Sequence, residues 1–208
     1  GSDWIPGSAG SNALIFTDTT LVGISSIDGG AGNDIILGAA GDDTIVGGLG
    51  NDRLEGGLGN DALVSGPGAD RLFGNEGDDR LFIENDEFFL VDGGAGTDTV
   101  VFDFTLDLQT VIDTRLQNIE SFDLRSGGDA ALTIGLNDVL AAASGINALT
   151  NSTETLLIRR DLGDVVNVVG DNWTEGADTL DTDNDGVSEG YTVFHDSTAG
   201  ATVYVENV

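Results

Sequence analysis

The sequence of 208 residues contains no cysteine, which excludes disulfide bonds and thiolate metal sites as sources of stability. Basic residues are scarce as well, with 7 against 37 acidic ones and a formal net charge of −30. This charge would repel nucleic acids and anionic membrane surfaces, and it opposes compaction of the free chain. No run of ~20 apolar residues that could span a membrane is present, and no N-terminal signal-peptide pattern occurs. The chain therefore needs a source of stability other than disulfides, and one that offsets its negative charge.

The sequence also lacks a recognisable catalytic constellation. His195 is the sole histidine and stands next to Asp196, but a Ser-His-Asp relay needs an activated serine as well, and no nucleophile-elbow motif occurs. We expect a surface or strand-edge histidine here. Many carboxylates stand in pairs that could in principle perform acid–base chemistry, but they recur with a strict period that is typical of metal ligands. We therefore expect no enzymatic activity.

Glycine and aspartate, by contrast, are abundant and regularly spaced between Gly29 and Val101. Seven units follow the nine-residue pattern Gly-Gly-x-Gly-x-Asp-x-U-x, in which U is a large aliphatic residue. The units read GGAGNDIIL from Gly29, GAAGDDTIV from Gly38, GGLGNDRLE from Gly47, GGLGNDALV from Gly56, SGPGADRLF from Ser65, GNEGDDRLF from Gly74 and GGAGTDTVV from Gly93. The aspartate slot holds Asp34, Asp43, Asp52, Asp61, Asp70, Asp79 and Asp98. Seven units in one register are far beyond a chance match.

Each unit divides into a six-residue turn and a three-residue strand. Glycine permits positive φ and lets the backbone approach an ion closely, and aspartate supplies the hard anionic oxygen that calcium prefers. Because side chains alternate across a strand, the U residues would point inward and stack into a thin apolar core. They are Ile36, Ile45, Leu54, Leu63, Leu72, Leu81, Leu90 and Val100.

The nonapeptides resemble the RTX repeat of secreted bacterial proteins, over roughly a third of the chain. The resemblance implies a parallel β-roll in which two units form one coil, so that units eighteen residues apart stack on the same edge and share a calcium ion. One edge would then carry Asp34, Asp52 and Asp70, and the other Asp43, Asp61, Asp79 and Asp98. Each ion would be held by two aspartates and by glycine carbonyls of neighbouring coils, which gives about five sites. The expected carbonyl ligands are Gly30, Gly32, Gly41, Gly48, Gly50, Gly57, Gly59, Gly66, Gly68, Gly77, Gly94 and Gly96.

Two further segments are degenerate copies of the repeat that flank or interrupt the array at residues 29–101. Residues 7–15 keep the glycine and aliphatic slots but have Asn12 in place of aspartate, and we interpret residues 1–28 as an N-terminal cap. Residues 83–92 have Phe88 in the aspartate slot and one extra residue. We interpret them as a coil that keeps Leu90 in the core, loses one metal site and accommodates the extra residue as a bulge. The alternative is an ordinary loop extruded from the roll.

From about Phe102 the glycine period stops, and residues 102–208 form a separate β-rich region. Alternating runs predict strands at residues 121–124, 131–134, 155–158, 165–169, 191–194 and 201–205, and one short helix is predicted at residues 137–144. The succession NIESFDL, LNDVL, GDVV, Trp173 and YTVF resembles the C-terminal region of large RTX adhesins, which caps the roll and leads into a secretion signal. The expected fold is therefore all-β, a parallel β-roll (calcium-binding RTX solenoid) with a β-rich C-terminal capping region that contains one short helix.

Residues 181–189 match the first nine positions of an EF-hand-like calcium loop, with Gly186 at the sharp turn. Position twelve of such a loop is Thr192 here and not glutamate, so another carboxylate would have to complete the shell. The expected ligands are Asp181, Asp183, Asp185, the carbonyl of Val187, and Glu189. The alternative is an acidic, solvated turn.

Outward strand positions of the roll carry Arg53, Arg71 and Arg80, with Arg53 and Arg71 expected one coil apart. These arginines either neutralise the acidic surface and block edge pairing, or form a ladder for an anionic glycan. An ice-binding face would need a regular threonine ladder, and the sequence has none.

Two classes of function fit these observations. The first is a structural and export module of a secreted adhesin, disordered in the low-calcium cytosol, exported by a type I secretion apparatus and folded by millimolar calcium outside or on the cell surface. Its C-terminal secretion signal, which the resemblance implies, would explain the missing signal peptide. We expect a monomer whose partners are calcium ions and the secretion apparatus, without nucleic-acid binding or membrane insertion. The second is a binding module for a glycan or a protein, as an accessory of a larger RTX protein or enzyme.

Overall fold

The computed structural model contains two compact units, residues 1–101 and residues 102–208. It describes residues 3–16, 24–110, 115–125, 129–135, 155–160, 162, 164–170, 173–180, 189–196 and 199–208. Every regular element among these residues is a β-strand, and none of them belongs to a helix long and apolar enough to cross a membrane. The helix predicted at residues 137–144 lies outside the described residues.

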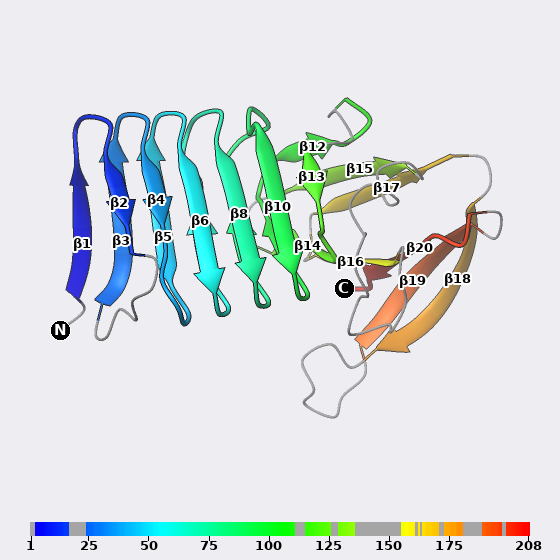
Figure 1. Ribbon diagram of the computed structural model, residues 1–208. Coiled ribbons are helices and arrows are strands. Elements are labelled where there is room, and N and C mark those ends of the chain that lie inside the picture. The colour runs from blue at the N-terminus through cyan, green and yellow to red at the C-terminus, as the bar shows by residue number, and fades with distance from the viewer. Residues whose placement is uncertain are drawn as a thin grey trace. The chain divides into compact units, whose positions relative to one another are not determined.

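The first unit is a parallel β-solenoid of about five turns, which confirms the predicted β-roll (Figure 1). The chain alternates between two parallel sheets, which face each other across a narrow core. One sheet contains β1 (Asp3–Ser8), β3 (Ile24–Ala31), β5 (Thr44–Leu49), β7 (Ala62–Val64), β9 (Arg80–Phe82) and β11 (Thr99–Val101). The other contains β2 (Ala13–Ile15), β4 (Ile35–Leu37), β6 (Arg53–Leu58), β8 (Arg71–Glu76) and β10 (Leu90–Ala95).

The register of both sheets follows the eighteen-residue spacing of the repeat. Ile36 pairs with Leu54, and Leu54 with Leu72. Ile45 pairs with Leu63 in the opposite sheet. All these side chains are fully buried, as are Leu81 and Val100. Because only one aliphatic side chain per strand points inward, a single coil buries little apolar surface, and stability depends on stacking.

Leu90 does not hold the core position that the sequence indicated. Val91 pairs with Leu72 and is fully buried, whereas Leu90 pairs with Arg71 and is half-buried. The extra residue of this coil causes the difference, because a shift of one residue turns every side chain to the opposite face of a strand. Phe89 and Leu90 both donate their N–H to the carbonyl of Asp70, at 2.8 and 3.2 Å, which marks the bulge.

The two degenerate segments are otherwise coils of the roll. Residues 7–15 lie in the stack, since Leu14 of β2 pairs with Ile36 of β4. Residues 83–92 lead into β10, which pairs in parallel with β8, so they are not a loop extruded from the roll. Phe88, the residue predicted in the aspartate slot, is buried with 1 % of its surface exposed.

The second unit also contains parallel sheets, but its strands are separated by longer stretches of chain. Its strands are β12 (Thr105–Asp107), β13 (Leu116–Gln117), β14 (Ser121–Asp123), β15 (Ala131–Gly135), β16 (Thr155–Arg159), β17 (Val165–Val169), β18 (Trp173–Leu180), β19 (Glu189–Asp196) and β20 (Thr202–Glu206). β12, β15 and β17 pair in parallel, as do β14, β16 and β20. β19 and β18 then continue the second sheet in antiparallel orientation. The predicted strands of this half all coincide with observed ones.

The change of register at β10 gives the first testable prediction. Val91→Ala should destabilise the folded protein by about 2 kcal/mol, because it removes two buried carbon atoms and leaves a cavity. Leu90→Ala removes more atoms but should cost less than about 1 kcal/mol, because the side chain is only half-buried. Urea unfolding at one saturating calcium concentration measures both values. A larger loss for Leu90→Ala would contradict the observed register.

Candidate metal centre

The seven predicted aspartates lie directly before strands and form two ladders along the edges of the roll. Asp34, Asp52 and Asp70 precede β4, β6 and β8, all strands of one sheet. The other ladder precedes strands of the opposite sheet and consists of Asp43, Asp61, Asp79 and Asp98. Asp43 is half-buried, and the other six side chains are buried with 2 % or less of their surface exposed. The structure therefore separates the aspartates into the two edges that the repeat predicts.

In five of the ladder aspartates, Oδ1 accepts a hydrogen bond from the backbone of the preceding coil. The donor is the N–H of the aspartate one coil earlier. The bonds run from Asp34 to Oδ1 of Asp52 (2.7 Å), Asp52 to Asp70 (2.7 Å), Asp43 to Asp61 (2.8 Å), Asp61 to Asp79 (2.7 Å) and Asp79 to Asp98 (2.8 Å). These five adjacent pairs are the pairs expected to share an ion.

The second carboxylate oxygen has no hydrogen-bond donor in five of the ladder aspartates, whereas Oδ2 of Asp43 accepts the N–H of Ala39 at 2.7 Å. Oδ2 is buried and without a hydrogen-bond partner in Asp34, Asp52, Asp61, Asp70 and Asp79. A buried polar atom without a partner costs free energy, and a buried charge costs more unless it is paired or coordinates a metal. The recurrence of this feature in successive coils indicates that a cation belongs beside these oxygens.

The space beside these oxygens is lined by a backbone carbonyl of the next coil. A Cβ atom at Gly47 would lie 2.6 Å from Oδ2 of Asp52 and 2.5 Å from the carbonyl oxygen of Ser65. A Cβ at Gly29 would meet Oδ2 of Asp34 and the carbonyl of Gly47 at the same distances. Glycine in the first slot of the unit thus keeps open a space that carboxylate and carbonyl oxygens surround, which fits the oxygen coordination of calcium.

Side-chain ligands alone would not complete such a site. Among the described residues, no three histidine, cysteine, aspartate or glutamate side chains converge in a way that could hold a metal ion. A calcium ion would therefore depend on two aspartates and on backbone carbonyls, which is the ligand set that the repeat implies.

Comparison with known protein families agrees with this geometry. The model of the RTX calcium-binding nonapeptide repeat matches residues 23–54 and 55–82, with four copies. The roll is an array of RTX repeats. A search of curated proteins finds no match to the chain. The RTX array is thus a calcium-binding structural module.

The glycine carbonyls predicted as RTX ligands stack in columns along the roll. A Cβ at Gly48 would touch the carbonyl oxygen of Gly30, and one at Gly66 would touch that of Gly48. All twelve of these glycines have positive φ, for example 100° at Gly48 and 134° at Gly50, a conformation that other residues adopt at a cost. The first-slot carbonyls of Gly47 and Ser65 were missed, because every residue has a carbonyl and the sequence does not tell which ones face the aspartates.

A further row of hydrogen bonds, made by the residues at the fifth position of the repeat unit, was not predicted from the sequence either. Here a side-chain oxygen accepts the backbone N–H of slot five in the following coil. Asn51 donates to Oδ1 of Asn33 (2.9 Å), Asn60 to Asp42 (2.9 Å) and Asp78 to Asn60 (2.8 Å). The recurrence of asparagine or aspartate at this slot is the signal that could have revealed it. The hydrogen bonds of the aspartates and those of the fifth position together connect the turns to the neighbouring coils.

The ladder of Asp34, Asp52 and Asp70 is followed by different residues at its two ends. The backbone N–H and the side-chain Nδ2 of Asn12 both donate to Oδ1 of Asp34, at 2.6 and 3.0 Å. The side-chain amide of Asn12 therefore lies where a carboxylate would form another pair with Asp34. Beyond Asp70 the next coil has Phe88 and Phe89 directly before β10, so aromatic side chains replace the carboxylate there.

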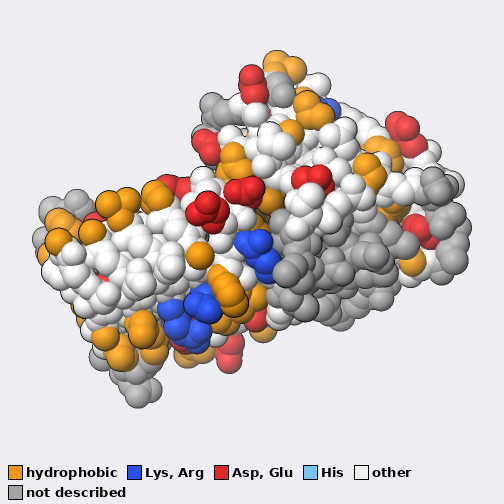
Figure 2. Space-filling model, turned by 90° about the horizontal axis from the view of Figure 1, so that it is seen from above, with side chains coloured by type: hydrophobic (Ala, Val, Ile, Leu, Met, Phe, Trp, Pro, Cys, Tyr) orange, Lys and Arg blue, Asp and Glu red, His pale blue; other side chains and the backbone are white. Residues whose placement is uncertain are grey.

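Arginine and aromatic side chains cover part of the outer surface of the roll, and Figure 2 shows basic and hydrophobic side chains gathered there. Three guanidinium groups lie over phenylalanine rings, with centroid distances of 4.2 Å for Arg53 on Phe73, 3.9 Å for Arg71 on Phe89 and 5.4 Å for Arg80 on Phe82. Arg53 and Arg71 face each other in the register of β6 and β8, one coil apart as predicted. The stacks of Arg53 and Arg71 reach onto the following coil and add roughly 0.5–1 kcal/mol each to the stacking of coils.

Most of the EF-hand-like loop predicted in the second unit lies outside the described residues. This applies to Asp181, Asp183, Asp185 and Val187, while Glu189 is the first residue of β19 and pairs with Leu180. His195 is exposed in β19, and its Nδ1 lies 3.0 Å from Oγ1 of Thr202. This is the strand position expected for the single histidine.

Burial raises the pKa of four of the RTX aspartates. Desolvation raises the pKa of Asp61 to about 7 and those of Asp70 and Asp79 to about 6, against a hydrogen bond from the backbone that lowers each of them. Desolvation also raises the pKa of Asp52. Without a cation, the folded roll therefore binds protons more tightly than the unfolded chain does.

This shift predicts how pH acts on the calcium-free protein. Because the folded pKa values lie above the unfolded value of 3.8, protonation favours the fold below them, and this contribution is lost as the pH rises through about 6 to 7. The β signal in far-ultraviolet circular dichroism, measured in chelator, should therefore increase as the pH is lowered from 8 to 5. In saturating calcium the signal should change little, since bound calcium keeps the sites deprotonated. A calcium-free β signal that increases with pH would contradict the shifts.

The cap at Asn12 predicts a gain of metal binding. Asn12→Asp places a carboxylate in register with Asp34 and should raise the number of bound calcium ions by one, as counted by isothermal titration calorimetry. Asn33→Asp is the matched control, because it adds the same charge at the exposed fifth slot and should leave the number unchanged. Equal counts in both variants would show that the pairing of aspartates does not define the sites.

Proposed function

We propose that this chain is a calcium-dependent folding and structural module of a secreted bacterial RTX adhesin. The observation that carries the proposal is the stack of buried carboxylates whose Oδ2 atoms lack a donor. Five aspartate pairs lie in the roll, so we propose about five bound calcium ions, with a sixth if residues 181–189 bind one. Bound calcium would supply positive charge and act as a bridge between coils.

The net charge supports a coupling between calcium binding and folding. At −30 the free chain repels itself, and burial in the folded roll adds a desolvation cost for each ladder aspartate. About five divalent ions would contribute roughly ten positive charges and offset a third of the net charge. Because the sites require two adjacent coils, they do not exist in the unfolded chain, and binding free energy becomes folding free energy.

This coupling suits a protein that must leave a cell unfolded. In a cytosol that is low in calcium the chain would stay disordered, and millimolar calcium outside would fold it. We therefore propose export by a type I secretion apparatus and a location outside the cell or on its surface. RTX membership and the resemblance of residues 118–194 to adhesin C-terminal regions support this proposal. No catalytic activity forms part of it.

A second candidate function is ligand binding by the outer surface of the roll, as an accessory module of a larger RTX protein or enzyme. The observation in its favour is the row of Arg53 and Arg71 beside aromatic rings, one of which, Phe89, is 55 % exposed. An anionic glycan or an acidic protein segment would complement this row. In this case calcium would still build the surface but would not be the purpose of the module.

A calcium titration followed by far-ultraviolet circular dichroism tests the first proposal. We expect a cooperative gain of β signal near millimolar calcium, since extracellular calcium-binding modules have dissociation constants of about 10⁻⁴ to 10⁻³ M. Magnesium should not reproduce it, because magnesium demands a stricter geometry. A chain that is fully folded in chelator would overturn the proposal and favour the ligand-binding candidate.

Two variants test the shared aspartates. Asp61→Ala removes a ligand from two pairs, with Asp43 and with Asp79, and should move the calcium midpoint to higher concentration. Asp34→Ala removes a ligand from one pair, with Asp52, and should move it less. Equal shifts of the two midpoints would count against ions shared between neighbouring coils.

A further inference from the structure

The second unit repeats the hydrogen-bond pattern of the RTX turn without repeating its sequence. Asp164 directly precedes β17 and is buried. Its Oδ1 accepts the N–H of Ala130, the residue before β15, at 2.8 Å. The N–H of Val165 in turn donates to the carbonyl of Ala130 at 2.9 Å.

The roll contains the same pair of bonds at each ladder step. The N–H of Asp52 donates to Oδ1 of Asp70 at 2.7 Å, and the N–H of Arg71 donates to the carbonyl of Asp52 at 2.8 Å. Asp164 therefore has the position in the β15–β17 pair that Asp70 has in the β6–β8 pair. The two units differ in the groups that lie near the aspartates that precede their strands.

In the second unit, an arginine reaches the turn that contains Asp164. Arg160 donates from Nη1 to the carbonyl of Asp164 at 3.2 Å and from Nε to the carbonyl of Glu206 at 3.0 Å. Its backbone N–H donates to Oε2 of Glu206 at 3.3 Å. A guanidinium group thus bonds backbone carbonyls from two separate segments, as a bound cation would.

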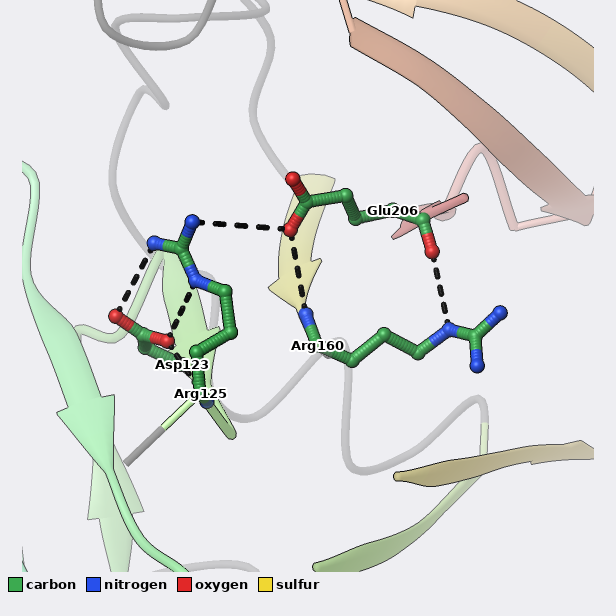
Figure 3. A network of polar contacts seen from close by, with 4 residues as sticks. All are labelled: Asp123, Arg125, Arg160 and Glu206. Carbon is green, nitrogen blue, oxygen red and sulfur yellow. Dashed lines mark hydrogen bonds and ion pairs between the residues drawn. The ribbon is translucent and has the colours of Figure 1, made fainter. Parts of the chain in front are cut away.

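A second arginine neutralises the carboxylate at the end of β14 (Figure 3). Arg125 donates from Nε to Oδ1 of Asp123 at 3.0 Å and from Nη2 to Oδ2 at 3.3 Å. Its Nη1 lies 4.0 Å from Oε2 of Glu206, so Glu206 stands between the two arginines. Both oxygens of the buried Asp123 have donors, in contrast to Asp52 and Asp70, whose Oδ2 atoms have none.

Arginine is well suited to this position. Its guanidinium group stays charged at all physiological pH values and binds a carboxylate through two parallel hydrogen bonds. Asp123 and Glu206 expose 7 % and 14 % of their side chains. A buried charge that has a partner inside the protein does not need an ion from solution.

We infer that Arg125 and Arg160 supply in residues 102–208 the positive charge that calcium supplies in the roll, so that this unit keeps its parallel strands without calcium. The inference rests on the proposed function for the calcium dependence of the roll. Calcium then controls the folding of the roll, while β14, β16, β17 and β20 keep their pairing at any calcium concentration. In such a module the second unit stays folded at every calcium concentration, and the folding of the roll depends on the calcium concentration.

Hydrogen exchange of the full chain, followed by mass spectrometry in chelator and in saturating calcium, tests the inference. In chelator, amides of β14, β16, β17 and β20 should be protected, while those of β4 to β9 should exchange rapidly. Addition of calcium should protect β4 to β9 and leave the exchange of β14, β16, β17 and β20 unchanged. Rapid exchange of these four strands in chelator, with protection gained at the same calcium concentration as the roll, would overturn the inference.

The experiment also separates this inference from the proposed function. Protection of β4 to β9 in chelator would contradict the calcium-dependent roll, whatever the second unit does. The double variant Arg125→Gln/Arg160→Gln should lose the protection of β14, β16 and β20 in chelator and keep the calcium-induced protection of the roll. Arg71→Gln, whose guanidinium stacks on Phe89 in the roll, is the matched control and should keep the second unit protected. Unchanged protection in the double variant would show that the arginines do not hold the unit together.

Discussion

The roll depends on the burial of aspartate carboxylates between stacked coils. One oxygen of each pair binds the backbone of the neighbouring coil, and Oδ2 of Asp34, Asp52, Asp61, Asp70 and Asp79 has no donor in the protein. The arrangement is unfavourable for the protein alone, because burial raises the pKa of Asp52, Asp61, Asp70 and Asp79 and like charges lie one above another. A cation that binds both carboxylates removes both penalties. We therefore propose that folding and ion binding are one coupled event.

The remainder of the unit follows from this constraint. Glycine occupies the first slot in six of the seven units, and at Gly47 a side chain would collide with the carboxylate of Asp52 in the same unit. The glycine-rich turns leave one inward aliphatic residue per strand, and a core this thin cannot offset the conformational entropy of so many glycines. Stacking of coils, together with the ions that we propose between them, provides the stability that the core lacks. The acidic excess, the glycine content and the absence of disulfides thus have one physical cause.

The chain completes a coil without a carboxylate pair in three different ways. An asparagine amide donates to Asp34 at the first coil, Phe88 is buried in the coil after Asp70, and Arg125 binds the carboxylate of Asp123 in the second unit. Each substitute is neutral, apolar or permanently charged, so none requires an ion. The five adjacent pairs of aspartates between Asp34 and Asp98 are the steps at which we propose that calcium binds.

The sequence by itself determined the repeat and the core residues of the regular units, because each is a property of local periodicity. The eighteen-residue coil and the division of the aspartates into two edges were implied by the resemblance to RTX proteins. Only the tertiary structure decided the register at β10, since Leu90 and Val91 are equally aliphatic and one inserted residue selects between them. It also decided which carbonyls approach Asp52, because all carbonyls are alike in sequence. The contacts of Arg125 and Arg160 with Glu206 join segments far apart in the chain, and no local pattern relates them. The spacing of residues in the sequence predicts the periodic structure. The effect of an inserted residue and the partners of a distant ion pair depend on how the folded segments pack.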